Sequence, residues 1–225
     1  NLVAVLADIK NNPDIDAIVF TGDLTHDHSN ASYDLFVEAI QQTSICVPVY
    51  YLAGNHDDKT VLASAFACEP FNGQKLIELP NWQVILLDSK GDTPAGRVST
   101  ESLCWLTSAV DKDKSQLLMM HHHGIDVGYF IDRHGLENKE KFWQVIKEQP
   151  SIKAVACGHV HRALSLLPKE TGRPVPLFTC PATSIQFDPL AGTVASTGEA
   201  GGYRVFQLSQ EGKINTYVRY TELAY

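Results

Sequence analysis

The sequence VYYLAGNHDD, residues 49–58, joins a run of strand-forming apolar residues to a glycine that is followed by Asn, His and two acids. Two interpretations are open. Gly, Asn and Asp are common residues of surface turns, whereas Asn, His and Asp also offer oxygen and nitrogen atoms to metal ions. This stretch alone does not decide between a turn and a metal site, so the question is whether the pattern recurs.

Three other apolar runs end in residues of the same kind. They are AIVFTGD, which ends at Asp23, QLLMMHHHG, which contains His121-His122-His123, and IKAVACGHVH, which contains His159 and His161. Ligands of open α/β sheets bind beyond the carboxyl ends of the strands, so four such endings would gather these side chains in one pocket. Turns that arise by coincidence explain one ending more readily than four, and the recurrence favours a metal site.

The residue types fit a centre with two metal ions. The carboxylate of Asp23 has two oxygens and can bridge cations that lie ~3.5–4 Å apart. Asn55 supplies a neutral oxygen, and His122, His159 and His161 supply nitrogens that favour zinc or iron over magnesium alone. Two cations can hold a phosphate and lower the pKa of a bridging water. The pattern therefore predicts metal-assisted hydrolysis of a phosphoester.

Composition restricts the partners of the chain. Its 225 residues, 44% of them hydrophobic, suit one globular domain. The net charge of −8 argues against a broad surface for nucleic acid or anionic lipid, and no apolar run is long enough to cross a bilayer. The five cysteines form no C-x-x-C pair and stand among apolar neighbours, which predicts buried free thiols in a reducing cytoplasm. We expect a cytoplasmic protein with a small-molecule partner, and the oligomeric state stays open.

Apolar runs alternate with longer amphipathic stretches. The strands expected in this way are Ala17–Thr21, Val47–Ala53, Gln83–Leu87, Gln116–Met120, Ile152–Cys157 and Pro176–Thr179. The expected helices are Leu2–Asn11, Ala31–Thr43, Thr60–Ala67, Thr100–Asp111 and Leu136–Glu148. The final segments GGYRVFQL and KINTYVRY read as two strands joined by a turn. This alternation predicts an α/β fold in which helices cover both faces of a sheet.

The four strand endings, in this order, resemble those of the calcineurin-like metallophosphoesterases. The resemblance is closest to the bacterial class III 3',5'-cyclic AMP phosphodiesterases, and the segments that carry it are VFTGDLTHDHSNASYDLF, LAGNHDD, VILLDS, MMHHHGID, CGHVH and PATSIQF. It runs from about Ile15 to Phe187. It implies an α/β fold of the four-layer α+β type: a β-sandwich of two mixed sheets flanked by helices, with the metal site at the carboxyl ends of strands. This replaces the single sheet expected from the alternation.

The resemblance also implies roles for individual residues. Asp23 matches the bridging carboxylate, Asn55, one triplet histidine and His159 would hold the second metal, and His161 would serve the first. The family places the triplet ligand two residues before a proline, and that proline position is Gly124 here. His122 is therefore the preferred ligand and His121 the reserve. The metals implied are two divalent ions of iron, manganese or zinc.

His56 matches a histidine that is not a ligand but contacts phosphate and protonates the leaving oxygen. Asp57 would orient it, and the substrate would contact Asn55, His56 and His161. His26 is close enough in sequence to reach the edge of the site, but His26 and His28 are interpreted as solvated loop residues.

One family motif is missing ahead of Gly22-Asp23. The family begins with Asp-x-His on its first strand, and both residues bind the first metal. We expect this motif upstream of Asn1, so that residues 1–225 form a single calcineurin-like phosphoesterase domain without its first strand. The alternative is a version of the fold that has lost half of one metal site.

The function expected is metal-dependent hydrolysis of 3',5'-cyclic AMP to 5'-AMP, by attack of a metal-bridging hydroxide. One alternative is the same chemistry on another diester, such as a glycerophosphodiester. A second alternative is a metal-poor scaffold that keeps the fold without catalysis.

Overall fold

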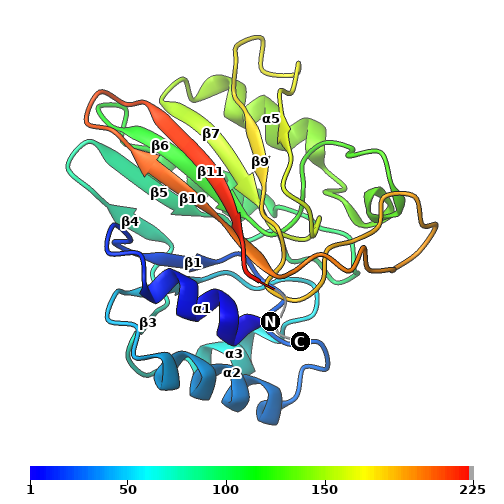
Figure 1. The fold of residues 1–225 in the computed structure, drawn as a ribbon. Coiled ribbons are helices and arrows are strands. Elements are labelled where there is room, and N and C mark those ends of the chain that lie inside the picture. The colour runs from blue at the N-terminus through cyan, green and yellow to red at the C-terminus, as the bar shows by residue number, and fades with distance from the viewer. Residues whose placement is uncertain (223–225) are drawn as a thin grey trace.

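Helices and strands alternate through most of the computed structural model, which describes residues 1–222 (Figure 1). The helices are α1 (Leu2–Lys10), α2 (Asn30–Thr43), α3 (Lys59–Ala65), α4 (Thr100–Ala109), the 3-10 helix η1 (Phe130–His134) and α5 (Lys139–Glu148). The first strands are β1 (Ile18–Phe20), β2 (Val49–Tyr51), β3 (Phe71–Asn72), β4 (Leu76–Glu78), β5 (Trp82–Leu86) and β6 (Ser115–Met120). The later strands are β7 (Ile152–Cys157), β8 (Ser165–Leu166), β9 (Leu177–Thr179), β10 (Gly202–Leu208) and β11 (Ile214–Tyr220).

The strands form two layers. One layer is a six-stranded mixed sheet in the order β4-β5-β6-β7-β9-β8, parallel in its centre and antiparallel at both outer pairs. The other layer consists of the parallel strands β1-β2-β3 and the separate antiparallel pair β10-β11. The central strands of the large sheet are buried on both faces, which is why they read as nearly continuous apolar runs.

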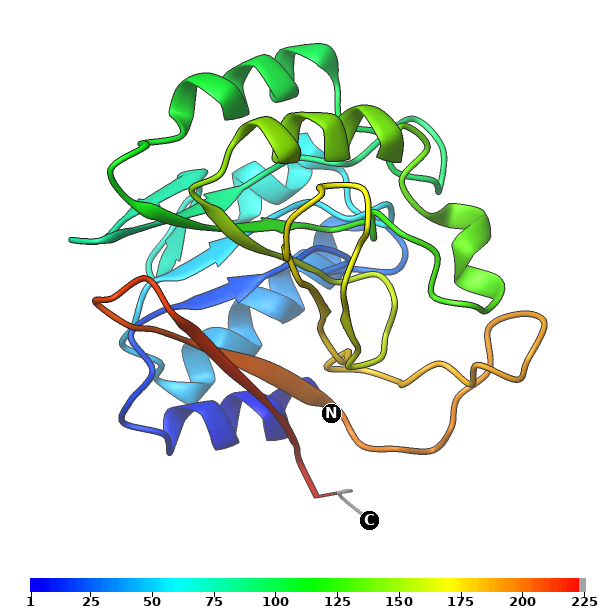
Figure 2. The ribbon, with the colours of Figure 1, turned by 90° about the horizontal axis from the view of Figure 1, so that it is seen from above.

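Three apolar cores hold the layers together. The core between the sheets contains Leu52 of the segment after β2, Leu86 of β5 and Leu117 of β6. A second core packs α4 and α5 on the outer face of the six-stranded sheet, and a third packs α1, α2 and α3 against β1 and β2. Figure 2 shows α4 and α5 on one side of the strands and α1 on the other. The expected β-sandwich flanked by helices is thus confirmed, although the smaller layer is split between β1 and β10.

Helix α2 shows how the local sequence gives rise to these elements. Tyr33, Phe36 and Ile40 recur at helical spacing and are all buried against the sheet. The hydroxyl of Ser29 accepts a hydrogen bond from the Ser32 N–H at 3.2 Å, which caps the first turn. Ser44 ends the helix in a left-handed conformation, with φ of 54°. The helix is therefore fixed at both ends and along its buried stripe.

Some expected details differ from the structure. The short strands β3, β4 and β8 were not expected, because two or three residues carry too little periodicity to stand out. Helix α5 begins at Lys139 instead of Leu136, because the Asn138 side chain donates to the Val98 carbonyl and bonds the preceding segment to a neighbouring loop. The prediction of buried thiols is wrong for three of the five, since Cys46, Cys68 and Cys104 are exposed. Among residues 1–222, no helix has the length and apolar character needed to span a bilayer.

Candidate metal centre

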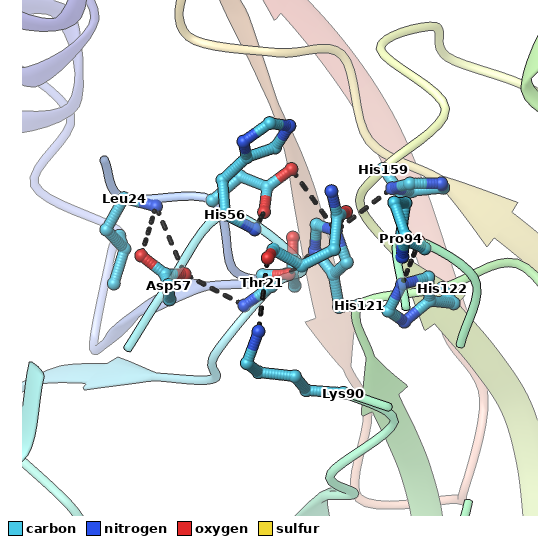
Figure 3. A network of polar contacts seen from close by, with 12 residues as sticks. Thr21, Leu24, His56, Asp57, Lys90, Pro94, His121, His122 and His159 are labelled. Carbon is cyan, nitrogen blue, oxygen red and sulfur yellow. Dashed lines mark hydrogen bonds and ion pairs between the residues drawn. The ribbon is translucent and has the colours of Figure 1, made fainter. Parts of the chain in front are cut away.

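His121 lies where the two strand layers meet. Its Nε2 is 3.1 Å from Asn55 Oδ1, 3.1 Å from His159 Nδ1 and 3.3 Å from Asp23 Oδ2 (Figure 3). Its Nδ1 is 2.7 Å from the Thr21 carbonyl, to which it donates its proton. A histidine whose second nitrogen is held by a carbonyl in this way presents Nε2 as a lone-pair donor. The endings of β1, β2, β6 and β7 therefore converge on one point, as the sequence predicted.

His159 provides a direct test of whether this cluster suits a metal ion. It is buried, and within residues 1–222 its Nε2 has no hydrogen-bond partner. An unpaired buried polar nitrogen is costly unless a ligand satisfies it. The other ring nitrogen, Nδ1, lies 3.1 Å from Nε2 of His121. With the oxygens of Asp23 and Asn55, these two nitrogens make a mixed N/O donor set that suits a divalent transition metal. These residues fit the ion.

His122 does not have a comparable position, although it is the preferred ligand in the sequence analysis. Its Nδ1 lies 3.0 Å from the Ser89 hydroxyl and its Nε2 lies 3.2 Å from the Pro94 carbonyl. One ligand atom of His122 is within 4.8 Å of those of His121 and His159, but both of its nitrogens already have partners. The contacts therefore favour the reserve, His121, over His122.

The alternation of β6 gives the physical reason. Leu117 and Met119 face the core between the sheets, whereas Leu118 and Met120 face the helices. Side chains two apart share a face of a strand, so His121 continues the inner face toward Asp23 and Asn55. His122 continues the outer face. The alternation of inward and outward residues along β6 can be read in the sequence. It is a better guide to the ligand than the position at which the family has a proline.

His161 borders the same cavity as Asp23, Asn55, His121 and His159, a space of about 1540 Å³. Its Nδ1 donates to the Ile185 carbonyl at 2.9 Å, which leaves Nε2 as a donor to a metal. Its ring stacks on Phe187, with centroids 4.0 Å apart and an angle of 4°. Phe187 was not singled out from the sequence, because nothing in the chain marks which aromatic residue packs on a ligand.

His123, the last of the triplet, points to a different partner. Its Nε2 lies 3.1 Å from the Asp132 carboxylate, and its ring stacks on that of His159 with centroids 5.6 Å apart. Burial lowers the pKa of His123, and the nearby Asp132 charge offsets this only in part. It supports the cluster by packing against His159.

The Asp57 carboxylate bonds the loops around His56 and not the imidazole ring of His56. The carboxylate accepts hydrogen bonds from the N–H groups of Gly54 at 2.8 Å and Leu24 at 3.1 Å, and from the Tyr33 hydroxyl at 3.0 Å. In Figure 3 the His56 imidazole points away from it. The structure thus does not show the direct orientation of His56 by Asp57 that the resemblance implied. Tyr33 was missed, because its place in a helix gives no sign of this contact.

The backbone around the cluster is tightly constrained. Asp23, His159 and His161 have φ of 56°, 61° and 52°, in the left-handed region that residues other than glycine rarely adopt. A Cβ on Gly54 would lie 2.1 Å from Asp23 Oδ1. Glycine is thus required for the turn after β2 to approach the carboxylate. Such strain persists where surrounding contacts enforce it, often at functional sites.

The charges of the cluster are also coupled. Burial on its own raises the pKa of Asp23, but the charge and hydrogen bond of His121 outweigh it and hold that pKa well below its usual range. Burial lowers the pKa of His121, yet the Asp23 charge reverses this and leaves it raised. Burial and the neighbouring imidazoles lower the pKa of His159 well below its ordinary value. Asp23 is therefore anionic and His159 neutral, the forms in which both bind metals.

Comparisons with known proteins agree with this geometry. The profile of the calcineurin-like phosphoesterase family matches residues 1–163. A probable cyclic nucleotide phosphodiesterase of Colwellia psychrerythraea (strain 34H) is 53% identical over 221 residues, which cover 97% of this chain and 84% of that protein. The 3',5'-cyclic adenosine monophosphate phosphodiesterase CpdA of Vibrio vulnificus (strain CMCP6) is 33% identical over 92% of this chain and 75% of its own.

A solved structure shows the same fold. The crystal structure of a dimetal phosphatase from Danio rerio aligns with a TM-score of 0.64 and 14% identity, over 98% of this chain and 89% of that one. With the profile match and the sequence relatives, the chain belongs to the calcineurin-like phosphoesterase family.

Proposed function

We propose that this protein hydrolyses 3',5'-cyclic AMP to 5'-AMP with the help of two divalent metal ions. The observation that carries the proposal is the convergence of Asp23 Oδ2, Asn55 Oδ1 and His159 Nδ1 on Nε2 of His121, each within 3.3 Å of that nitrogen. The names of the relatives, cyclic nucleotide phosphodiesterases from several bacteria, support the substrate. The cysteine content led us to expect a cytoplasmic protein, and this location stays a prediction.

The ligands proposed are Asp23, Asn55, His121 and His159 for one metal, with Asp23 and His161 serving the other. His121 takes the place of His122 because its Nε2 faces Asp23 and Asn55. Iron, manganese and zinc all suit this mixture of nitrogen and oxygen donors. When bound, the ions supply an activated water and neutralise charge on the phosphate.

The chain itself supplies the remaining chemistry. Asn55 and His161 would contact the phosphate next to the metals, and His56 would give its proton to the ribose 3'-oxygen as the P–O bond to that oxygen breaks. Asp57 would keep the His56 backbone in place by holding the N–H groups of Gly54 and Leu24. The alkoxide of a ribose is a poor leaving group, so protonation at this atom matters.

The proposal includes a further strand, which would carry the Asp-x-His motif and complete the smaller strand layer. Strands β1 and β10 both border the cavity that reaches the histidines, and within residues 1–222 each pairs with a strand on one edge alone. Apolar side chains such as Val19 and Val205 line the space between them. One more strand would fit there and join the split layer into one sheet. A strand parallel to β1 would end beside Asp23, where the Asp-x-His ligands of the first metal are expected.

The substrate assignment is tested with the purified full-length protein. Metals are removed with a chelator, and Mn²⁺, Fe²⁺ or Zn²⁺ is restored before cyclic AMP, cyclic GMP and glycerophosphocholine are supplied separately. We expect metal-dependent formation of 5'-AMP, identified by chromatography. Faster hydrolysis of glycerophosphocholine would replace the proposed substrate, and a chain that neither binds metal nor hydrolyses any of the three would be a scaffold.

A further inference from the structure

The imidazole of His56 has no polar anchor in the described part of the chain. The carboxylate of Asp57 is engaged by backbone N–H groups and by Tyr33, and within residues 1–222 no hydrogen bond reaches either ring nitrogen of His56. Its backbone is well held, since its N–H donates to Asp23 Oδ1 at 2.8 Å. A half-buried side chain with a fixed backbone and a free ring can rotate unless something packs against it.

His26 packs against that ring. The two imidazoles are stacked, with centroids 4.9 Å apart and an angle of 28° between their planes. Offset stacking at such separations is a favoured arrangement of aromatic rings. His28 lies farther from His56, at 6.3 Å and 32°. All three rings border the cavity that contains the metal-binding histidines.

The loop that carries His26 is itself fixed. On one side of it, the Thr25 hydroxyl donates to the His56 carbonyl at 3.0 Å, which couples the two segments directly. On the other side, the Asp27 carboxylate accepts from the Ser29 N–H at 3.1 Å, and Ser29 caps helix α2. His28 is held in a left-handed conformation, with φ of 59°. Hydrogen bonds on both sides of His26 therefore hold the loop that places its ring against His56.

We propose that His26 is a positioning residue that holds the His56 imidazole in the orientation needed for proton transfer. The inference rests on the proposed function. In that reaction the oxygen of the activated water forms a bond to phosphorus, the bond between phosphorus and the ribose 3'-oxygen breaks, and the His56 proton moves to that 3'-oxygen. His26 exchanges no proton in this step. It restricts the ring of the donor, so its stacking surface matters and its nitrogens do not.

The activity test compares three variants of the full-length protein reconstituted with Mn²⁺. His26→Ala removes the stacking surface, His26→Phe keeps it without a titratable nitrogen, and His28→Ala is the matched control. Because misplacement of a proton donor forfeits part of its contribution, His26→Ala should lower kcat on cyclic AMP by about 10-fold. KM and metal content should change little. The loss should be much smaller on bis-p-nitrophenyl phosphate, whose leaving group needs no proton, and His26→Phe should restore most of the activity.

A second readout does not depend on activity. In histidine NMR spectra, the ring signal of His56 is assigned by its disappearance in His56→Ala. Loss of the neighbouring ring in His26→Ala should shift that signal, and His26→Phe should move it back. Equal kcat losses on both substrates, a larger effect of His28→Ala, or an unmoved His56 signal would each overturn the inference. If the unsubstituted protein does not cleave cyclic AMP, the proposed substrate fails, while the NMR comparison still decides the positioning role.

Discussion

The role of each imidazole in the cluster depends on the partner of its other nitrogen. His121 and His161 give their Nδ1 protons to backbone carbonyls, at Thr21 and Ile185, and each keeps Nε2 for a ligand. Both ring nitrogens of His122 already have hydrogen-bond partners, the Ser89 hydroxyl and the Pro94 carbonyl. His122 therefore differs from His121 and His161, although all three carry the same side chain, and the difference lies in the hydrogen bonds of the ring nitrogens.

Separate replacement of His121 and His122 distinguishes their roles. Loss of a group that merely orients a ligand costs about 10–100-fold in metal affinity, so loss of a ligand in His121→Ala should cost more than about 100-fold. His122→Ala should retain metal within about 10-fold and instead lose about 1–3 kcal/mol of stability, because the buried Ser89 hydroxyl loses the ring nitrogen of residue 122 and keeps only the bond from the backbone N–H of that residue. Titration with Mn²⁺, alongside circular dichroism to verify folding, measures both. The reverse order of affinities would restore His122 as the ligand.

Replacement of His56 separates proton transfer from metal binding. His56→Ala should keep the metals and slow cyclic AMP hydrolysis by about 10²–10⁴-fold, the usual contribution of a general acid. A nitrophenyl diester expels a stabilised phenolate, so it should be affected much less. Turnover of both substrates is measured in one preparation whose metal content is known. Equal losses would assign His56 to holding phosphate or metal.

At the scale of elements, the ends of strands decide what the protein can do. The parallel registers place Phe20 beside Tyr51 and Met120 beside Cys157, so the segments that follow these pairs begin at the same edge. Strand β7 ends in a fully buried thiol, and burial raises the pKa of Cys157 well above its ordinary value. This thiol remains neutral and acts as part of the core.

A buried and an exposed cysteine, Cys157 and Cys46, offer a matched test of this interpretation. Cys157→Ser places a hydroxyl in the apolar core and should lower the free energy of unfolding by about 1–3 kcal/mol. Cys46→Ser, at an exposed position, should change it by less than about 0.5 kcal/mol. Urea denaturation gives both values, and cyclic AMP turnover of the folded proteins should be almost unchanged. A folded Cys157→Ser protein without activity would mean that the thiol contributes to the reaction.

Most elements could be predicted from the sequence, whereas several side-chain partners could not. The strand Ile152–Cys157 was expected with the same bounds, because its apolar run is long and sharply delimited. The choice between His121 and His122 was within reach, since the alternation of Leu117 and Met119 continues to His121. The stacking of His26 on His56 was not, because it depends on how the turn at residues 27–29 folds back onto α2.

At the scale of the whole molecule, folding gathers side chains that can bind metal ions in one place. The chain carries a net charge of −8, and four of its buried titratable groups are the histidines His121, His122, His123 and His159, which lie near Asp23. Bound cations would reverse the local field there and attract an anionic phosphate that the rest of the surface repels. Under the proposed function, we therefore expect substrate to bind well only after the metals are bound.

Metal binding should release protons at neutral pH. Because the pKa of His121 is raised, its imidazole keeps a second proton beside Asp23 to a higher pH than a free imidazole does, and a divalent ion must displace that proton. The lowered pKa of His159 leaves that ring neutral. We expect a release of protons that is largest below the raised pKa of His121 and decreases as pH rises through that pKa. The His121 proton stabilises the fold at low pH and that stabilisation is lost as pH rises, so metal affinity should rise over the same interval. Titration calorimetry in two buffers with different ionisation enthalpies measures the release, and a constant zero between pH 6 and pH 8 would contradict it.

The most direct test of the metal centre is to measure metal content and cyclic AMP turnover in one preparation of Asp23→Ala. Asp88→Ala serves as the control, because Asp88 also follows a strand but bonds Lys90 and Lys59 on the surface. We predict that Asp23→Ala, still folded, loses both bound metal and formation of 5'-AMP, while Asp88→Ala keeps both. An Asp23→Ala protein that retains two metal ions and near-normal turnover would contradict the account.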